Sequence, residues 1–96
     1  MNQDKKPPLV SIICPAFNEE ADLERNLRRL DACLKTQAGY RFEILIVNDG
    51  SRDATGDVAE AFAAGRDDVR VFHHQFNFRL GQAIRTALHG SNGDIV

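Results

Sequence analysis

The sequence contains few of the features that mark membrane, secreted or metal-stapled proteins. No run approaches the ~20 apolar residues that a membrane-spanning helix needs, so we expect no transmembrane segment. Residues 1–8 are polar and lack the apolar stretch of a signal peptide, and we expect a flexible arm there. The only cysteines are Cys14 and Cys33, without a CxxC motif or a Cys/His cluster. They predict two buried thiols in a reducing cytoplasm, and neither a disulfide nor a zinc site.

Charge and missing signature motifs exclude several function classes. The formal net charge is −2, so nothing favours nucleic acid or an anionic membrane surface as a partner. The GxGxxG of dinucleotide-binding folds, the GxxxxGK[ST] of P-loop NTPases and the GxSxG of α/β-hydrolases are all absent. The 96 residues suffice for one small globular domain, which we place at residues 9–96.

Short apolar runs predict the strands of a sheet. Residues 9–14 and 42–47 are almost continuously apolar, as in strands covered on both faces of a parallel sheet. Residues 69–72 predict a third, less buried strand, and residues 93–96 the beginning of a fourth.

Helical periodicity fills the gaps between these runs. A leucine stripe predicts a helix over residues 19–36, with Asn18 as its cap. A second helix is predicted over residues 54–64, capped by Asp53 or Ser51. The stripe consists of Leu23, Leu27, Leu30 and Leu34.

A third amphipathic segment, residues 80–88, completes the order β-α-β-α-β-α-β. This order predicts a three-layer α/β/α, Rossmann-like fold with a doubly wound, mostly parallel sheet. Ligands of such sheets bind outside the carboxyl ends of the strands. The loops at residues 15–20, 48–53 and 73–81 leave those ends, so one crevice can gather all three.

The first of these loops has two interpretations. In a ligand site, Pro15 stiffens the exit from the strand, the small Ala16 lets a ligand approach the backbone, and Glu19 accepts a ribose hydroxyl. In a purely structural role, Asn18 caps the helix, and Glu19 and Glu20 complement its dipole.

The second loop is more informative. Asp49 directly follows a buried strand, so its carboxylate is expected at the mouth of the crevice, where it can accept an N–H from a nucleobase edge. Gly50 leaves space and permits a positive φ. An ordinary Asp-Gly turn explains Gly50 and Asp53, but it explains the position of Asp49 less well.

The third loop adds a cation and two histidines. Arg79 can bind a diphosphate, assisted by the amino end of the helix that follows, and Gly81 allows close approach. His73 and His74 have no partner at metal-ligand spacing, so we expect a partly exposed pair at the end of the strand.

Four segments, in this order, resemble the family-two inverting glycosyltransferases with the GT-A fold, over residues 10–96. Residues 11–20 look like the opening strand and Pro-x-Tyr/Phe-Asn-Glu motif of that family. Residues 43–55 look like its Val-Asp/Asn-Asp-Gly-Ser-x-Asp-x-Thr motif. Residues 77–85 are similar to its Asn-x-Gly-x-Gly-x-Ala segment, and residues 93–96 resemble the strand that leads to its metal-binding DxD.

The resemblance implies roles for individual residues. In the first motif, Pro15, Phe17 and Glu19 are implied to line the nucleotide pocket. Asp49 of the second motif is implied to contact the base, and Gly81 of the third to lie beside the nucleotide. Arg79 replaces the first glycine of the third motif, which leaves open whether it binds the diphosphate or faces solvent. Residues 80–85 look closest to polyprenyl-phosphate sugar synthases of the dolichol-phosphate mannose synthase type.

The resemblance also implies an activity. It is sugar transfer from a nucleotide-diphosphate sugar of the UDP or GDP type to an acceptor, such as a polyprenyl phosphate or a glycan. The resemblance also implies a cytoplasmic location, with the rest of the protein holding it at the inner face of a membrane. The DxD ligands of Mg²⁺ or Mn²⁺ and the catalytic base are expected beyond Val96. We therefore expect no metal ligand or catalytic residue in these 96 residues, no transfer by them alone, and self-association through apolar surface left exposed.

Two other classes compete with this interpretation. One is a non-catalytic nucleotide-binding module with a related sheet. The other is a flavodoxin-like interaction or receiver domain with Asp49 as phosphoacceptor, but receiver domains need a late lysine and none follows Lys35.

Overall fold

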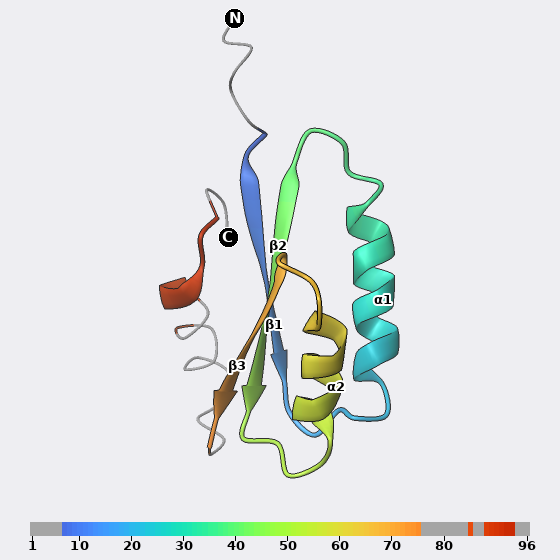
Figure 1. The fold of residues 1–96 in the computed structure, drawn as a ribbon, viewed down its shortest axis with the longest axis vertical. Helices are drawn as coiled ribbons and strands as arrows, with labels where there is room; N and C mark the ends of the chain where they lie inside the picture. Colours follow the sequence, from blue (N-terminus) through green and yellow to red (C-terminus); the bar gives the residue numbers. More distant parts are fainter. Residues whose placement is uncertain (1–6, 76–84, 86–87, 94–96) are drawn as a thin grey trace, which may run out of the picture.

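A computed structural model describes residues 7–75, 85 and 88–93 of the chain (Figure 1). Strands and helices alternate along it, as the sequence predicts. The elements are β1 (Leu9–Ala16), α1 (Leu23–Leu34), β2 (Arg41–Asp49), α2 (Thr55–Ala63) and β3 (Val69–His74).

The three strands form one parallel sheet in the order β1-β2-β3. Ile12 pairs with Ile44, and Ile46 with Val71, so the apolar runs lie side by side. Within the described residues the strand order follows the chain. The predicted fourth strand and most of the predicted third helix lie outside these residues, so the reversal of strand order stays a prediction.

Both faces of the sheet are covered. Figure 1 shows α1 and α2 on one side and a short helical segment near residue 88 on the other. On the α1/α2 side, Ile44 and Ile46 form a buried core with Leu23 and Leu27 of α1 and with Ala59 of α2. This arrangement follows from the leucine stripe, because a helix with one apolar face must bury it against the sheet.

The opposite face holds a second, smaller core. Leu45 and Val47 are fully buried there and pack against Ile13 and Phe72. A side chain at Gly90 would put its Cβ 2.5 Å from the Phe72 ring, so only glycine lets the chain approach this closely. The predicted α/β, Rossmann-like fold with a parallel sheet is therefore confirmed.

A buried carboxylate also lies on this second face. Glu43 Oε1 accepts hydrogen bonds from Ser11 Oγ at 2.7 Å and from the Asn92 N–H at 2.8 Å, and it lies 3.6 Å from the Arg70 guanidinium. Arg70 in turn donates to the Gly90 carbonyl. One charged group thus connects β1, β2, β3 and the segment at residues 90–92.

The prediction that Asn18 caps the first helix is wrong. The N-cap residue is Asp22, and residues 20–22 form a turn in which the N–H groups of Asp22 and Leu23 both donate to the Glu19 carbonyl. Asn18 has a φ of 50° and uses its side chain elsewhere. At α2 the N-cap residue is Ala54, without a side-chain cap, so neither Asp53 nor Ser51 occupies the predicted cap position; Asp53 accepts a hydrogen bond from the Thr55 N–H at 2.9 Å.

The prediction of two buried thiols holds for Cys14 only in part and fails for Cys33. Both cysteines are free, Cys14 is partly buried and Cys33 is exposed. Burial, with a smaller contribution from the charge of Glu19, raises the pKa of the Cys14 thiol to about 11. Cys33 is exposed because successive helical residues differ by about 100°, which turns it away from Leu34 and its apolar stripe.

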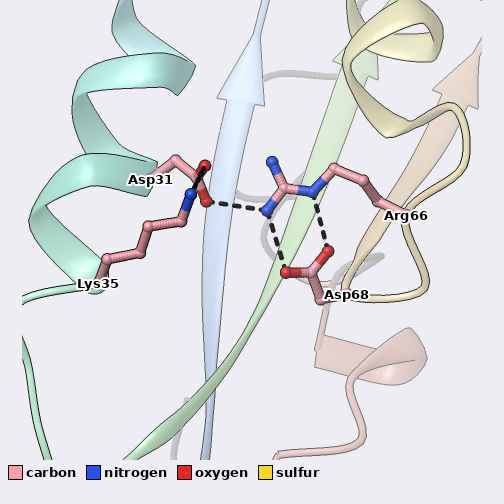
Figure 2. Close-up of polar contacts among 4 residues, drawn as sticks. All are labelled: Asp31, Lys35, Arg66 and Asp68. Atoms are coloured by element: carbon pink, nitrogen blue, oxygen red, sulfur yellow. Dashed lines mark hydrogen bonds and ion pairs between the residues drawn. The ribbon is translucent and has the colours of Figure 1, made fainter.

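An ion-pair cluster joins α1 to the loop before β3, at the amino edge of the sheet (Figure 2). Arg66 lies between Asp31, at 2.8 Å, and Asp68, at 3.0 Å, and Lys35 lies 3.4 Å from Asp31. Hydrogen bonds from Arg66 hold the pKa of each carboxyl below its ordinary value, although burial acts in the opposite direction. The Arg66 guanidinium also stacks 4.8 Å from the centre of the Phe62 ring. The cluster therefore connects the end of α1 to the loop before β3, at the edge of the sheet opposite the predicted site.

Candidate functional site

The first two predicted loops meet at the carboxyl edge of the sheet. They lie next to each other because β1 and β2 are neighbours, with Ala16 paired to Asn48. Backbone and side-chain groups connect them directly, so they form one unit with the start of α2. The bonds are Asn18 N–H to Ser51 Oγ (3.0 Å), Glu19 N–H to Thr55 Oγ1 (2.7 Å), Glu20 N–H to Asp53 Oδ2 (3.3 Å) and Arg52 N–H to Asn18 Oδ1 (2.9 Å).

Positive φ angles make these loops compact. Gly50 has a φ of 74°, which costs glycine nothing, and its N–H donates to the Asn48 carbonyl at 3.1 Å. Asn18 adopts a φ of 50°, a region that asparagine tolerates better than most residues. The predicted turn at Gly50 is therefore present, and Asn18 provides a second one.

Asp49 is the last residue of β2, which extends two residues beyond the predicted end of that strand. The residue is 5% exposed, and its Oδ1 lies 2.8 Å from Nδ1 of His74. His74 is the residue paired with it on β3. A carboxylate at the end of a buried strand thus stands beside a ring that can donate to it.

His74 is the site residue that sequence reasoning misses. His74 is only partly exposed, as the sequence predicts, and its side chain is 11% exposed. Its neighbour His73 is exposed as expected, and it contacts Asn48 at 3.0 Å and Glu60 at 2.7 Å. Strand alternation separates the two, because successive side chains point to opposite faces. The contact could have been predicted from longer strands. If the strands predicted to end at residues 47 and 72 are each extended by two residues, Asp49 pairs with His74.

The remaining predicted site residues lie at the same edge with different exposures. Pro15 is partly buried, and the Ala16 side chain is buried in the core. Phe17 is 43% exposed, and Glu19 is exposed. Arg79 and Gly81 lie outside the described residues, so the third loop is represented only by its beginning.

Neither a metal centre nor a membrane span is found in the part of the chain that the structure describes. There, His, Cys, Asp and Glu side chains form no group of three or more that could hold a metal ion. Its helices are too short or too polar to cross a bilayer. The Asp49 carboxylate next to His74 can accept hydrogen bonds.

Comparison with known proteins gives this edge its context. Residues 11–96 match the model of the family described as glycosyl transferase family 2. The chain belongs to that family. The predicted family-two resemblance is thereby confirmed, and membership argues against the receiver-domain interpretation.

Curated relatives of this family-two chain include sugar transferases. One is the undecaprenyl-phosphate 4-deoxy-4-formamido-L-arabinose transferase of Pseudomonas paraeruginosa, 42% identical over 92% of this chain and 26% of its own length. Another is the glycosyltransferase AglD of Haloferax volcanii, 32% identical over 88% of this chain and 14% of its own length. The chain thus spans about a quarter or less of these relatives.

A solved structure agrees with the fold. The mannosyltransferase PcManGT of Pyrobaculum calidifontis, solved in complex with GDP-Man and Mn²⁺, superposes with a TM-score of 0.74. The match covers 95% of this chain and 26% of the PcManGT chain, with 22% sequence identity. The GT-A glycosyltransferase fold predicted for the family-two chain is therefore confirmed.

Proposed function

We propose that this chain forms the nucleotide-binding part of a glycosyltransferase that transfers a sugar from a nucleotide-diphosphate sugar to an acceptor. The observation that carries this proposal is the buried Asp49 carboxylate at the end of β2, beside two loops joined by hydrogen bonds. In parallel α/β sheets this edge is the usual place for a ligand. The proposed site consists of Pro15, Ala16, Phe17, Glu19, Asp49 and Gly50, with Arg79 and Gly81 from the third loop.

Asp49 is proposed to recognise the nucleobase. Its carboxylate accepts several hydrogen bonds at once, so a bond from His74 is compatible with a second one from a base. Uracil and guanine each present a ring N–H to such an acceptor. Cytosine presents a ring acceptor at that position, which a carboxylate repels. The site therefore favours UDP- or GDP-type donors over CDP-type donors.

The first loop is proposed to hold the rest of the nucleoside. Phe17 offers an exposed aromatic face against which a base can pack. Glu19 is exposed on the same loop and can accept a hydrogen bond from a ribose hydroxyl. Arg79 is proposed to meet the diphosphate, by charge-assisted hydrogen bonds.

The acceptor and the metal are proposed from the relatives. The name of the P. paraeruginosa relative supports a polyprenyl phosphate as acceptor, and with it a place at the inner face of a membrane. A divalent metal ion, Mg²⁺ or Mn²⁺, would neutralise the departing diphosphate, and the PcManGT complex contains Mn²⁺. The chain spans 26% of the length of the P. paraeruginosa relative, so we expect the 96 residues alone to bind nucleotide without transferring sugar.

Calorimetric titration with UDP, GDP and CDP tests the nucleotide site. We expect UDP or GDP to bind the 96-residue chain, and Asp49→Ala to weaken that binding about tenfold, the equivalent of ~1.4 kcal/mol. Asp67→Asn is the matched control, because Asp67 is exposed in the loop before β3, at the opposite edge of the sheet. If neither nucleotide binds at millimolar concentration, or if Asp49→Ala binds like the wild type, the proposal fails.

A further inference from the structure

We propose that His74 is a positioning residue that fixes the Asp49 carboxylate and thereby sets the selectivity for the nucleobase. The inference rests on the proposed nucleotide site and adds a determinant of its specificity.

The geometry of the pair supports this role. Asp49 and His74 are the last residues of neighbouring strands and are register partners. Nδ1 of His74 lies 2.8 Å from Oδ1 of Asp49, which is the length of a strong hydrogen bond to a charged acceptor. The two side chains are 11% and 6% exposed, so water competes little for this bond.

A carboxylate at a strand end needs such a partner to keep one orientation. The aspartate side chain has three staggered χ1 positions and a nearly free terminal torsion. Discrimination between bases depends on where its oxygens lie, because hydrogen bonds weaken steeply with poor angles. A bond from His74 selects one arrangement before the nucleotide arrives, which reduces the ordering cost of binding.

The adjacent histidine provides a built-in contrast. His73 points to the other face of the sheet, where it contacts Asn48 and Glu60. The two histidines share one strand, but His74 contacts Asp49 whereas His73 contacts Asn48 and Glu60. A variant at His73 therefore controls for general effects of losing a ring at this end of β3.

The test compares the ratio of the CDP dissociation constant to that of the preferred nucleotide, UDP or GDP, by calorimetry. We expect a ratio of about tenfold or more for the wild-type chain, and a drop to about threefold or less for His74→Leu. His74→Asn should restore the ratio, because its amide N–H can take the place of the Nδ1–H. His73→Leu should leave it unchanged.

Each outcome decides between the two proposals. If the wild-type chain binds no nucleotide, the proposed function itself fails. If the wild type discriminates and His74→Leu discriminates equally, or if His74→Asn loses as much as His74→Leu, the inference about His74 is overturned while the proposed function stands. Should His74→Leu lose its folded circular-dichroism spectrum, His74→Gln replaces it with the same expected loss, because its amide lies one bond farther from the backbone.

Discussion

Asn18 bridges the two loops of the proposed site: its Oδ1 accepts a hydrogen bond from the Arg52 N–H at 2.9 Å, and its own N–H donates to Ser51 Oγ at 3.0 Å. Asn18 makes both bonds with a φ of 50°, which is unusual for a residue other than glycine. The bridge therefore helps to hold the first loop in place against the second.

Two substitutions of Asn18 separate its backbone role from its side-chain role. Asn18→Ala should lower the free energy of unfolding by about 2 kcal/mol, since it loses the bond to Arg52 and strains the left-handed backbone. Asn18→Gly should lower it by about 1 kcal/mol, because glycine adopts that φ without strain. Urea unfolding measures both, and equal losses would contradict this assignment.

Arg66 should contribute more stability than an ordinary surface arginine. It bonds to Asp31 on α1 and to Asp68 on its own loop, and its side chain is only 26% exposed. We expect Arg66→Ala to cost about 1–2 kcal/mol, because its charge-assisted bonds join two separate elements. Arg25→Ala removes an exposed pair with Asp22 within one helical turn and should cost less than about 0.5 kcal/mol. Equal losses of stability in the two variants, measured by thermal unfolding, would contradict the stabilising role of Arg66.

Glu43 should make the fold sensitive to acid. Burial acts to raise its pKa, but the Asn92 N–H, the Ser11 hydroxyl and the charge of Arg70 outweigh burial and hold the pKa below the ordinary value of 4.5. A lowered pKa in the folded state contributes stability that is present above that ordinary value. This contribution is lost as the pH falls through the lower, folded value.

Urea unfolding at about pH 7 and about pH 3 tests the role of Glu43. The Glu43→Gln variant should be less stable than the wild type at neutral pH and should lose less stability on acidification. The remaining acid sensitivity is expected from Asp31, Asp53 and Asp68, whose pKa values are also lowered. Glu24→Gln, on the exposed side of α1, is the control and should keep the wild-type pH dependence. The same dependence in Glu43→Gln would argue against a stabilising carboxylate.

The alternation of strands and helices was predictable because it depends on local patterns. The continuous apolar runs at residues 9–14 and 42–47 identified strands covered on both faces, and the leucine stripe identified the buried face of α1. The family was predictable for a related reason: its motifs are short, ordered and carried by the loops that follow the strands.

The polar partners were harder to predict because they depend on contacts distant in sequence. Asparagine is a common helix cap, but the side-chain oxygen of Asn18 accepts a hydrogen bond from Arg52, 34 positions later in the sequence. The sequence predicted a partly exposed pair of histidines but not the contact of His74 with Asp49, because that contact depends on the register of β2 and β3. Glu43 lies within an apolar run, and its partners Ser11 and Asn92 come from opposite ends of the chain.

Backbone NMR of the isotopically labelled 96-residue chain, titrated with UDP and with GDP, tests the central claim most directly. The proposed site predicts that the amide signals of residues 16–20 and 49–53 shift with one of these nucleotides. Signals of residues 36–40 and 64–68, at the amino edge of the sheet, should stay in place. Shifts centred on residues 64–68, or no shift with either nucleotide at millimolar concentration, would contradict a nucleotide site at the carboxyl edge.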